Sequence, residues 1–584
     1  MQMCGIIGRV SVSEDCTRTL ESLKLLEYRG YDSFGVLLYN KDRGEYVLER
    51  DVGEIDKKRF DSLKNLKSHI EIGHTRWATH GRVSKENAHP HFDFNRDFFV
   101  VMNGIVENFS EVKKKLVDKG YEFSSQTDTE VVVQLFSYYF VFGEDMEKSL
   151  LDALRKVIYD LEGEFSFLIK YRDYVLGYKN VNPLIVGRCE GEVVVSSDLR
   201  VVESGCDFYH VLDDCESFLC YNDENEVNLK FFDKNFKLYE KESMKSNYVH
   251  EEDFKDTNYF MEKEIFEQKD INRLYTKENF DNLRYLYGCL GSRRVVLTGA
   301  GTSYHAALYM KYVLLEMGIY SDVVLACELQ NYVKCMEGCQ VVLFSQSGET
   351  ADLIQPLRKI KDCEIFSITN TKNSTLDRMA SKSCYLNCGR EIGVASTKAF
   401  VFQMFVAKIL QSFYYDYDIE RKSEVFRKSF DSFVSKNRGI VKDLCDLFYG
   451  VSSIFYLGRG IYYPIALEGA LKLKELSYIH AEGFAGGELK HGSLALIEDN
   501  VPVVALGSSS EIISNAMEVK TRGGVVIGIS KNYSEVYDYF LEVPEYFEDV
   551  FATILMQVLA FEMAVALGYN PDKPRNLAKS VTVK

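Results

Sequence analysis

The sequence predicts two kinds of fold in one chain: an α+β domain with antiparallel sheet, followed by two α/β doubly wound domains. From residue 1 to about residue 240, short β-branched and aromatic runs such as 98–102 alternate with few helical stretches, which indicates antiparallel strands. Beyond residue 259, strand-like runs that end in small residues alternate with long helical stretches, which is typical of parallel βαβ units. A chain of 584 residues also exceeds the size of one hydrophobic core.

The second half of the chain is internally repeated. Two pairs of strand-to-loop runs occur at similar separation, each run leading into a helix: 295–303 with 341–349, and 454–460 with 503–511. A polar stretch without periodicity divides the two halves, as a linker would. We expect domains at 1–240, 259–423 and 424–575, a linker at 241–258 and a C-terminal tail at 576–584.

Charge and hydropathy exclude two classes of partner. The 70 basic and 87 acidic residues give a net charge of −17, which repels nucleic acid and anionic lipid. The longest apolar stretch, 551–569, is interrupted by Gln557 and Glu562, and no charged-then-apolar signal precedes the first strand-like run. We therefore expect a cytoplasmic protein with no nucleic-acid and no membrane partner.

The 14 cysteines are scattered along the sequence. The pairs Cys335/Cys339 and Cys384/Cys388 have no partner pair or histidines at the spacing of a zinc site. Reduced thiols and the absence of a metal site are therefore expected.

Two loops in the first repeat suit a phosphate group. A strand that enters a Gly/Ser/Thr loop and then a helix gathers backbone N–H groups and hydroxyls at a helix N-terminus. The alternative for such a loop is a helix cap with a tight turn. No Walker-type lysine and no Gly-x-Gly-x-x-Gly with a downstream acid is present, so a phosphorylated small molecule is preferred over a nucleotide. The candidate residues are Thr302, Ser303, Ser345, Gln346, Ser347 and Thr350.

One helix of the second repeat carries a charged stripe. Glu468, Lys472 and Glu475 fall at i, i+4 and i+7, so two carboxylates and an amine share one face and could move protons. A solvated salt-bridge face is the simpler interpretation of the spacing alone. The small and apolar flanking residues 466–471 favour close packing of this helix, and buried charges need a partner or a purpose.

Five longer stretches of the second half are more specific than either loop or the charged stripe alone. The stretches 465–475, 479–482, 487–492, 391–400 and 574–583 together closely resemble the glucosamine-6-phosphate synthase family (glutamine:fructose-6-phosphate amidotransferase, isomerizing). The similarity runs from about residue 259 to the C-terminus. It implies that the two doubly wound domains are sugar-isomerase domains.

The resemblance also implies roles for individual residues. Lys579 would form a Schiff base with the open-chain ketose, at an amine whose pKa an apolar tail could lower. Glu475 would carry a proton between the first two sugar carbons, assisted by Lys472 and oriented by Glu468. His491 would open the sugar ring from the neighbouring subunit, which implies a homodimer. The substrate, chiefly its phosphate, would be held by the two loops above together with Val394, Ser396 and Ala578.

Two of these residues have simpler alternatives. Lys579 could be a frayed terminal lysine. His491 could be a hydrogen-bonded structural histidine.

The first half resembles N-terminal-nucleophile glutaminases, on the stretches 27–33, 73–81, 87–91, 103–108 and 127–130. The resemblance implies that Cys4 is the nucleophile and that Asn103 and the Gly104 N–H form the oxyanion hole. Trp77 would gate an ammonia channel. Glutamine would be bound by Arg76, Thr79, His80, His89 and Asp128.

Simpler alternatives remain for three of these roles: the nucleophile, the channel gate and the charged pair that binds glutamine. Cys4 could be a small buried apolar group, Trp77 an ordinary core aromatic, and Arg76 with Asp128 a structural ion pair.

The sequence departs from the family pattern in a few places. Met1-Gln2-Met3 precede Cys4, whose own α-amine must act as the base. Either translation starts at Met3 and that methionine is removed, which we expect, or a longer piece is cleaved. The family's usual histidine, cysteine, proline and final glutamate are replaced by Met102, Ala300, Ser493 and Lys584.

The reaction implied by the resemblance converts fructose 6-phosphate and glutamine to glucosamine 6-phosphate and glutamate, the first step of the amino-sugar (UDP-N-acetylglucosamine) pathway, without metal or organic cofactor. One rival is a phosphosugar sensor without turnover, which would need neither Cys4 nor Lys579. Another is an enzyme of the same architecture that acts on a different phosphosugar or releases ammonia as a deaminase.

Overall fold

The computed structural model describes residues 4–78, 81–223, 226–246, 258–577 and 579. The described residues form two compact units, one within 4–246 and the other within 258–579. Each unit is described by itself.

The first unit contains two antiparallel sheets among its described residues. In the larger sheet the strand order is β15-β11-β9-β10-β1-β4-β2-β3, with β1 (Gly5–Ser11), β2 (Ser33–Asn40), β3 (Glu45–Val52), β4 (Ile70–Arg76), β9 (Ile185–Cys189), β10 (Glu192–Ser196), β11 (Phe208–Val211) and β15 (Met244–Lys245). In the other the order is β14-β13-β12-β8-β7-β6-β5, with β5 (His91–Phe92), β6 (Phe98–Val106), β7 (Gly163–Tyr171), β8 (Tyr174–Asn180), β12 (Glu216–Asp223), β13 (Glu226–Phe232) and β14 (Leu238–Tyr239).

The central strands of this unit are buried on both faces, whereas the edge strand β3 is not. Ile6 of β1 packs between the two sheets with Val101 of β6, whereas its neighbour Ile7 packs against helix α1, because successive side chains of a strand point to opposite faces. Helices therefore cover the outer face of each sheet, which gives four layers. The helices are α1 (Thr17–Leu26), η1 (Glu27–Arg29), α2 (Lys57–Leu63), α3 (Phe109–Val117), α4 (Thr129–Tyr139), α5 (Met146–Asp160) and α6 (Leu199–Glu203).

The second unit contains two parallel sheets with the same strand order in its described part. The first is β17-β16-β18-β19-β20, with β16 (Val295–Gly299), β17 (Ser321–Leu325), β18 (Gln340–Ser345), β19 (Glu364–Thr369) and β20 (Lys382–Tyr385). The second is β22-β21-β23-β24-β25, with β21 (Ser453–Gly458), β22 (His480–Ala485), β23 (Pro502–Leu506), β24 (Val525–Ser530) and β25 (Tyr539–Glu542). Both orders are 2-1-3-4-5 in sequence, and ligands of such sheets bind where the order reverses, beyond the carboxyl ends of strands 1 and 3.

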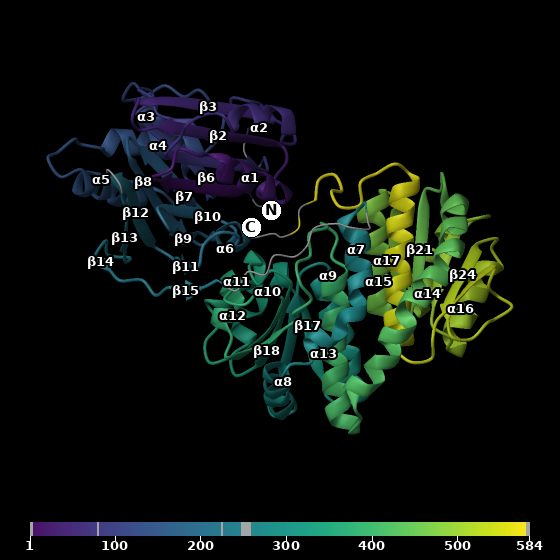
Figure 1. The fold of residues 1–584 in the computed structure, drawn as a ribbon. Coiled ribbons are helices and arrows are strands. Elements are labelled where there is room, and N and C mark those ends of the chain that lie inside the picture. The colour runs from purple at the N-terminus through teal and green to yellow at the C-terminus, as the bar shows by residue number, and fades with distance from the viewer. Residues whose placement is uncertain (1–3, 79–80, 224–225, 247–257, 578, 580–584) are drawn as a thin grey trace. The chain divides into compact units, whose positions relative to one another are not determined.

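One hydrophobic core joins these two sheets through a layer of helices. Figure 1 shows α9, α13, α15 and α17 in this layer, between the sheet that contains β18 and the sheet that contains β24. The helices of the unit are α7 (Phe260–Glu267), η2 (Gln268–Leu274), α8 (Lys277–Cys289), α9 (Thr302–Glu316), η3 (Ala326–Glu328), α10 (Leu329–Tyr332), η4 (Val333–Cys335), α11 (Ala351–Leu357), α12 (Thr375–Met379), α13 (Lys398–Tyr415), α14 (Ile419–Phe448), α15 (Tyr462–Ser477), η5 (Gly486–His491), η6 (Ser493–Leu496), α16 (Ser510–Lys520) and α17 (Glu548–Ala566).

Helix α17 is long and apolar enough to span a membrane by length and composition, but 89% of its most apolar window is buried inside the protein. Gln557 in its middle accepts a hydrogen bond from Gln268 at 2.8 Å, and Glu562 pairs with Arg438. These contacts are those of a core helix.

The predicted fold class is confirmed: an antiparallel α+β unit precedes two repeated parallel sheets. The predicted boundary at 423/424 falls inside α14, and most of the predicted linker, 247–257, lies outside the described residues. The expectation of reduced thiols throughout is wrong for one pair. Cys189 on β9 and Cys206 form a disulfide, because β9 and the segment after α6 bring their Cα atoms to 5.0 Å, a proximity that sequence spacing does not reveal.

Candidate functional site

Cys4 lies just before β1, against the backbone of Trp77. The Trp77 N–H donates to Cys4 Sγ at 3.3 Å, and the thiol lies 3.5 Å from the Trp77 carbonyl oxygen. Burial raises the pKa of the Cys4 thiol to about 11, although the Trp77 backbone and Arg76 oppose the shift. A thiol with such a pKa stays protonated near neutral pH, so it needs a base before it can attack.

The peptide that holds Cys4 is itself fixed by close packing. A Cβ on Gly30 would lie 2.6 Å from the Arg76 carbonyl carbon, so only glycine fits there. The Trp77 ring meets Tyr31 edge-on, with ring centroids 5.4 Å apart. Tight packing of the 27–33 stretch against β4 therefore positions the Trp77 backbone for Cys4.

Arg76 and Asp128 bring opposite charges to the same place. Arg76 ends β4, Asp128 precedes α4, and both are buried. Burial lowers the pKa of Arg76, while Cys4 and Asp128 act to raise it, which shows that the three groups are neighbours. Asp128 Oδ2 also accepts from the Val106 N–H at 2.9 Å, so this carboxylate is fixed at the end of β6.

Asn103 and Gly104 occupy one end of β6. Asn103 is buried, and its Nδ2 has no hydrogen-bond partner among the described residues. Gly104 has φ of +105°, and an added Cβ would lie 2.0 Å from the Glu164 carbonyl oxygen, so no other residue fits. An unpaired buried amide costs about 1–3 kcal/mol, which a ligand oxygen would relieve.

Three buried histidines in ring contact with one another begin at Asn103, and only His89 among them had a role predicted from the sequence. His74 on β4 donates from Nε2 to Asn103 Oδ1 at 3.1 Å and stacks on His89, with ring centroids 4.1 Å apart. His89 Nδ1 accepts from the Met102 N–H at 3.4 Å, and His91 Nε2 lies 2.9 Å from Thr127 Oγ1. Burial, reinforced by Arg76, lowers the pKa of His74 to about 3, and burial also lowers the pKa of His89 and His91. The imidazoles are therefore neutral, and His74 fixes which way the Asn103 amide points.

The predicted phosphate loops lie beyond strands 1 and 3 of the first parallel sheet. Thr302 and Ser303 open α9 after β16, and Ser303 Oγ accepts from Gln403 Nε2 at 3.3 Å. Ser345 ends β18, where its Oγ accepts from the Gly348 N–H at 3.0 Å and lies 2.9 Å from Thr350 Oγ1. Both loops thus meet at the reversal of the strand order.

The second loop is shaped by one glycine and one backbone carbonyl. Gly348 has φ of +68° and leaves no room for a Cβ, which would lie 2.0 Å from Ser374 Oγ. The Gln346 carbonyl accepts from the Asn370 N–H at 3.1 Å, and Ser347 Oγ accepts from the Glu349 N–H at 3.2 Å. These bonds hold the loop over the end of β18.

The charged stripe of α15 is buried rather than solvated. Glu468 and Lys472 are each 1% exposed, and Lys472 Nζ lies 2.6 Å from Glu475 and 3.5 Å from Glu468. Burial alone would lower the pKa of Lys472, but Glu475 and Glu468 outweigh it and the pKa is raised. The alternative of a solvent-exposed salt-bridge face is therefore excluded.

Glu468 connects the stripe to the first phosphate loop. Its Oε1 accepts from Thr302 Oγ1 at 3.0 Å, and its Oε2 accepts from His305 Nδ1 at 2.7 Å. His305, on α9, was not predicted. It follows Thr302 by three residues on a helix, which is the signal that could have placed it on the same face.

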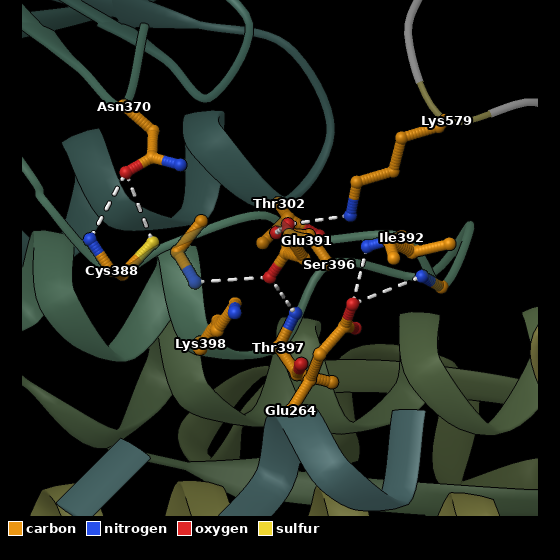
Figure 2. Close-up of polar contacts among 12 residues, drawn as sticks. Glu264, Thr302, Asn370, Cys388, Glu391, Ile392, Ser396, Thr397, Lys398 and Lys579 are labelled. Atoms are coloured by element: carbon orange, nitrogen blue, oxygen red, sulfur yellow. Dashed lines mark hydrogen bonds and ion pairs between the residues drawn. The ribbon is translucent and has the colours of Figure 1, made fainter. Parts of the chain in front are cut away.

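Lys579 lies in a buried pocket and not at a frayed end. Its side chain is 5% exposed, and its Nζ donates to Glu391 Oε2 at 2.5 Å (Figure 2). Ser396 Oγ donates to the same carboxylate oxygen at 3.0 Å, so Glu391 joins two predicted site residues. Glu391 was part of a recognised stretch but had no predicted role.

The C-terminal segment reaches this pocket through Asp572. Its carbonyl accepts from the Val394 N–H at 3.1 Å, and its carboxylate accepts from the N–H groups of Phe260 and Met261 at 2.8 and 2.7 Å. Lys579 is therefore brought beside Val394 and Ser396 by a tail that is bound to α7.

Some predicted residues are found neither near Cys4 and Asn103 in the first unit nor near Glu475 and Lys579 in the second. Thr79, His80, Ala578 and the Met1-Gln2-Met3 leader lie outside the described residues. His491 ends η5 and is exposed, and no hydrogen bond or ion pair joins it to Glu475 or Lys579 within the described part of the chain.

One group of side chains has the composition of a metal site. Glu14, Asp42 and His69 place ligand-type atoms within 4.8 Å of one another. Glu14 is already paired with the Lys67 ammonium, which competes with a cation for that carboxylate. These residues are best described as a charge cluster of the first unit.

Comparison with known proteins matches both units of the chain. A model of the glutamine amidotransferase domain matches residues 45–240, and a model of the SIS domain matches twice, at 290–411 and 447–566. Over an alignment of 633 positions, gaps included, the chain is 37% identical to a glutamine–fructose-6-phosphate aminotransferase (isomerizing) of Methanosarcina mazei. Over 624 positions it is 36% identical to one of Pyrococcus horikoshii. Each alignment covers 100% of this chain and 100% of the relative.

Two solved structures are also similar to part of the chain. The C-terminal domain of glucosamine-fructose-6-phosphate aminotransferase from Francisella tularensis is 31% identical, with a TM-score of 0.48, over 55% of this chain and 98% of that one. A glucosamine-6-phosphate deaminase from Thermotoga maritima is 24% identical, with a TM-score of 0.47, over 56% and 100%.

Proposed function

The chain belongs to the family of isomerizing glutamine–fructose-6-phosphate aminotransferases, and from that membership we propose which residues perform each part of the reaction. The enzyme uses glutamine as the nitrogen donor and fructose 6-phosphate as the acceptor, and it forms glucosamine 6-phosphate and glutamate. The observation that carries the assignment is the buried Glu468–Lys472–Glu475 face, which contacts the Thr302 end of the phosphate loops.

The first unit hydrolyses glutamine. Cys4 attacks the side-chain amide, and the freed α-amine of the processed chain accepts the thiol proton, since the thiol is not ionised by its surroundings. The Asn103 Nδ2 and the Gly104 N–H stabilise the oxyanion that develops. Arg76 and Asp128 bind the charged end of glutamine, with Thr79, His80 and His89 completing the site.

The second unit carries out the sugar chemistry. The hydroxyls of the two loops and the N-termini of their helices bind the phosphate, and Val394, Ser396 and Ala578 also bind the substrate. Lys579 forms the Schiff base with the ketose, and Glu475 transfers the proton between the first two sugar carbons. Lys472 supports Glu475 through their 2.6 Å contact, while Glu468 aligns Thr302 and His305.

Four finer features belong to the same proposal. His491 is exposed at the end of η5, which suits a residue that completes the site of a second subunit in a homodimer. Trp77, whose backbone binds Cys4, gates the passage of ammonia. The enzyme works in the cytoplasm, and the domain limits are those expected from the sequence except at 423/424, a boundary that falls inside α14.

The test is to incubate the purified protein with fructose 6-phosphate and either glutamine or an ammonium salt, and to detect the products by mass spectrometry. Glucosamine 6-phosphate from both nitrogen sources is the expected result. Product from ammonium alone would contradict the assignment of the first unit or the removal of Met1-Gln2-Met3. No product from either source would contradict the assignment of the second.

A further inference from the structure

The segment that precedes α13 forms a buried carboxylate pocket around Lys579. Glu391 is fully buried, and its two oxygens have different partners. Oε1 accepts from the N–H groups of Thr397 and Ala399, at 2.9 and 3.0 Å. Oε2 faces Lys579 Nζ and Ser396 Oγ. One oxygen thus fixes the loop, and the other is directed at the amine that reacts.

A second carboxyl group lies in the same pocket and is held differently. Glu264 on α7 accepts through Oε1 from the N–H groups of Ile392 and Gly393, and its Oε2 is buried without a hydrogen-bond partner among the described residues (Figure 2). Burial raises the pKa of Glu264 to about 8; the negative charge of Glu391 adds to this shift, and the positive charge of Lys579 opposes it. Burial also acts to raise the pKa of Glu391, but the Lys579 ammonium and the Thr397 and Ala399 N–H groups outweigh it and lower the pKa to about 2.

The two carboxyl groups are therefore in different states near neutral pH. Glu391 is a carboxylate in contact with Lys579, while Glu264 is a neutral acid that fixes residues 392 and 393. Carboxyl pairs whose surroundings separate their pKa values mark an acid and base assignment. Two other ammonium groups lie near this pocket, and each has its own carboxylate: Lys398 is paired with Glu267, and Lys472 with Glu475.

This arrangement conflicts with the expected route to a reactive amine. A lysine that attacks a carbonyl must first lose a proton, and the sequence suggested that an apolar tail lowers its pKa. In the structure Lys579 instead contacts an ionised carboxylate. The proton can pass directly to that carboxylate across 2.5 Å as the amine attacks, because loss of the ammonium charge removes the interaction that lowers the Glu391 pKa, and burial then favours the protonated carboxyl group. The amine therefore does not have to be neutral at rest.

We propose that Glu391 is the proton acceptor and donor for Schiff-base formation by Lys579. This inference rests on the proposed function. Glu391 takes one proton from the Lys579 ammonium, and the free amine adds to the ketone carbon, so that the C–N bond forms and the carbonyl π bond breaks. A second nitrogen proton moves to the former carbonyl oxygen. Glu391 then returns its proton to this hydroxyl, the C–O bond breaks, and water leaves with both protons. The protonated imine that remains keeps the Glu391 carboxylate as its counter-ion.

The experiment is to trap the imine with borohydride in the presence of fructose 6-phosphate and to follow the mass of the intact chain. Glu391→Gln is the informative variant, because its amide oxygen can still accept from Thr397 and Ala399 while the charge is lost. We expect its trapping rate to fall at least about 100-fold, the usual contribution of a general acid–base group. Glu278→Gln, which removes a carboxylate from the exposed pair with Lys372 in the same unit, is expected to trap at close to the wild-type rate.

Two further variants keep the inference falsifiable. Lys579→Ala is expected to give no adduct, which identifies the trapped residue. If Glu391→Gln does not fold, Glu391→Asp keeps the charge at a longer distance and is expected to trap about tenfold more slowly than wild type, as imperfect proton-transfer geometry predicts. A correctly folded Glu391→Gln or Glu391→Asp that traps at the wild-type rate would overturn the inference. A wild-type enzyme that makes no glucosamine 6-phosphate would instead overturn the proposed function.

Discussion

The two units surround their reacting groups with opposite kinds of environment. Around Asn103 in the first unit, three buried imidazoles are neutral and Cys4 is a protonated thiol. Around Lys472 and Lys579 in the second unit, buried ammonium groups are held against carboxylates. The difference follows from the chemistry. An oxyanion that forms during amide hydrolysis is best met by neutral, preoriented donors, whereas repeated proton transfer on a sugar needs acids and bases in contact.

The largest expected effect comes from breaking the charge balance of the second unit. Lys472→Met leaves the carboxylates of Glu468 and Glu475 buried without their ammonium, which should lower the free energy of unfolding by about 3–5 kcal/mol. Urea unfolding and the ammonium-dependent rate measure the loss. Lys474→Met, two residues along the same helix at an exposed position, is the matched control and should change stability by at most about 0.5 kcal/mol. Equal effects of the two substitutions would contradict the importance of the buried stripe.

The next effect is confined to the first unit. Asn103→Ala removes one of the two proposed oxyanion donors, so kcat with glutamine should fall about 100- to 1,000-fold. The rate with ammonium is the internal control and should not change. A similar loss with both nitrogen sources would mean that Asn103 acts through the fold and not on glutamine.

The stability of the two units should change with pH in opposite directions. The pKa of His74 is lowered from 6.5 to about 3 on folding, so the unfolded chain binds the extra proton and the first unit loses stability as pH falls below 6.5. The pKa of Glu264 is raised from 4.5 to about 8, so the second unit gains stability over the same fall, down to about pH 4.5. Each group changes the free energy of unfolding by at most about 1.4 kcal/mol per pH unit.

This contrast can be measured in one sample. Trp77 is the only tryptophan of the chain, so its fluorescence follows urea unfolding of the first unit. Hydrogen exchange of the α15 amides follows the second unit. Parallel changes in both signals between pH 6.5 and pH 5 would contradict the assigned protonation states.

The smallest expected effect concerns a single hydroxyl. Ser345→Ala removes the group that accepts from Gly348, so the KM for fructose 6-phosphate should rise about fivefold, equivalent to one hydrogen bond of about 1 kcal/mol. Ser367→Ala, a buried serine in the middle of the neighbouring strand β19, is the control and should leave this KM unchanged. An unchanged KM in Ser345→Ala would place the phosphate elsewhere.

The sequence predicted the fold and the buried stripe of α15, because both rest on local patterns. Strand, loop and helix follow one another at 295–303 and 341–349, and the apolar neighbours of Glu468 correctly favoured a buried stripe. The sequence did not predict contacts between segments that are distant along the chain. Glu391 and Lys579 are 188 residues apart, and Glu264 reaches the same pocket from α7. His74 was part of a recognised stretch, yet its role depends on β4 and β6, which belong to different sheets.

The two units are expected to perform separate reactions that share only ammonia. The most direct test is the Cys4→Ala variant, assayed for glucosamine 6-phosphate with glutamine and with ammonium. We predict that synthesis from glutamine is lost while synthesis from ammonium continues at the wild-type rate. Synthesis from glutamine by this variant, or loss of both activities in a folded protein, would contradict the account.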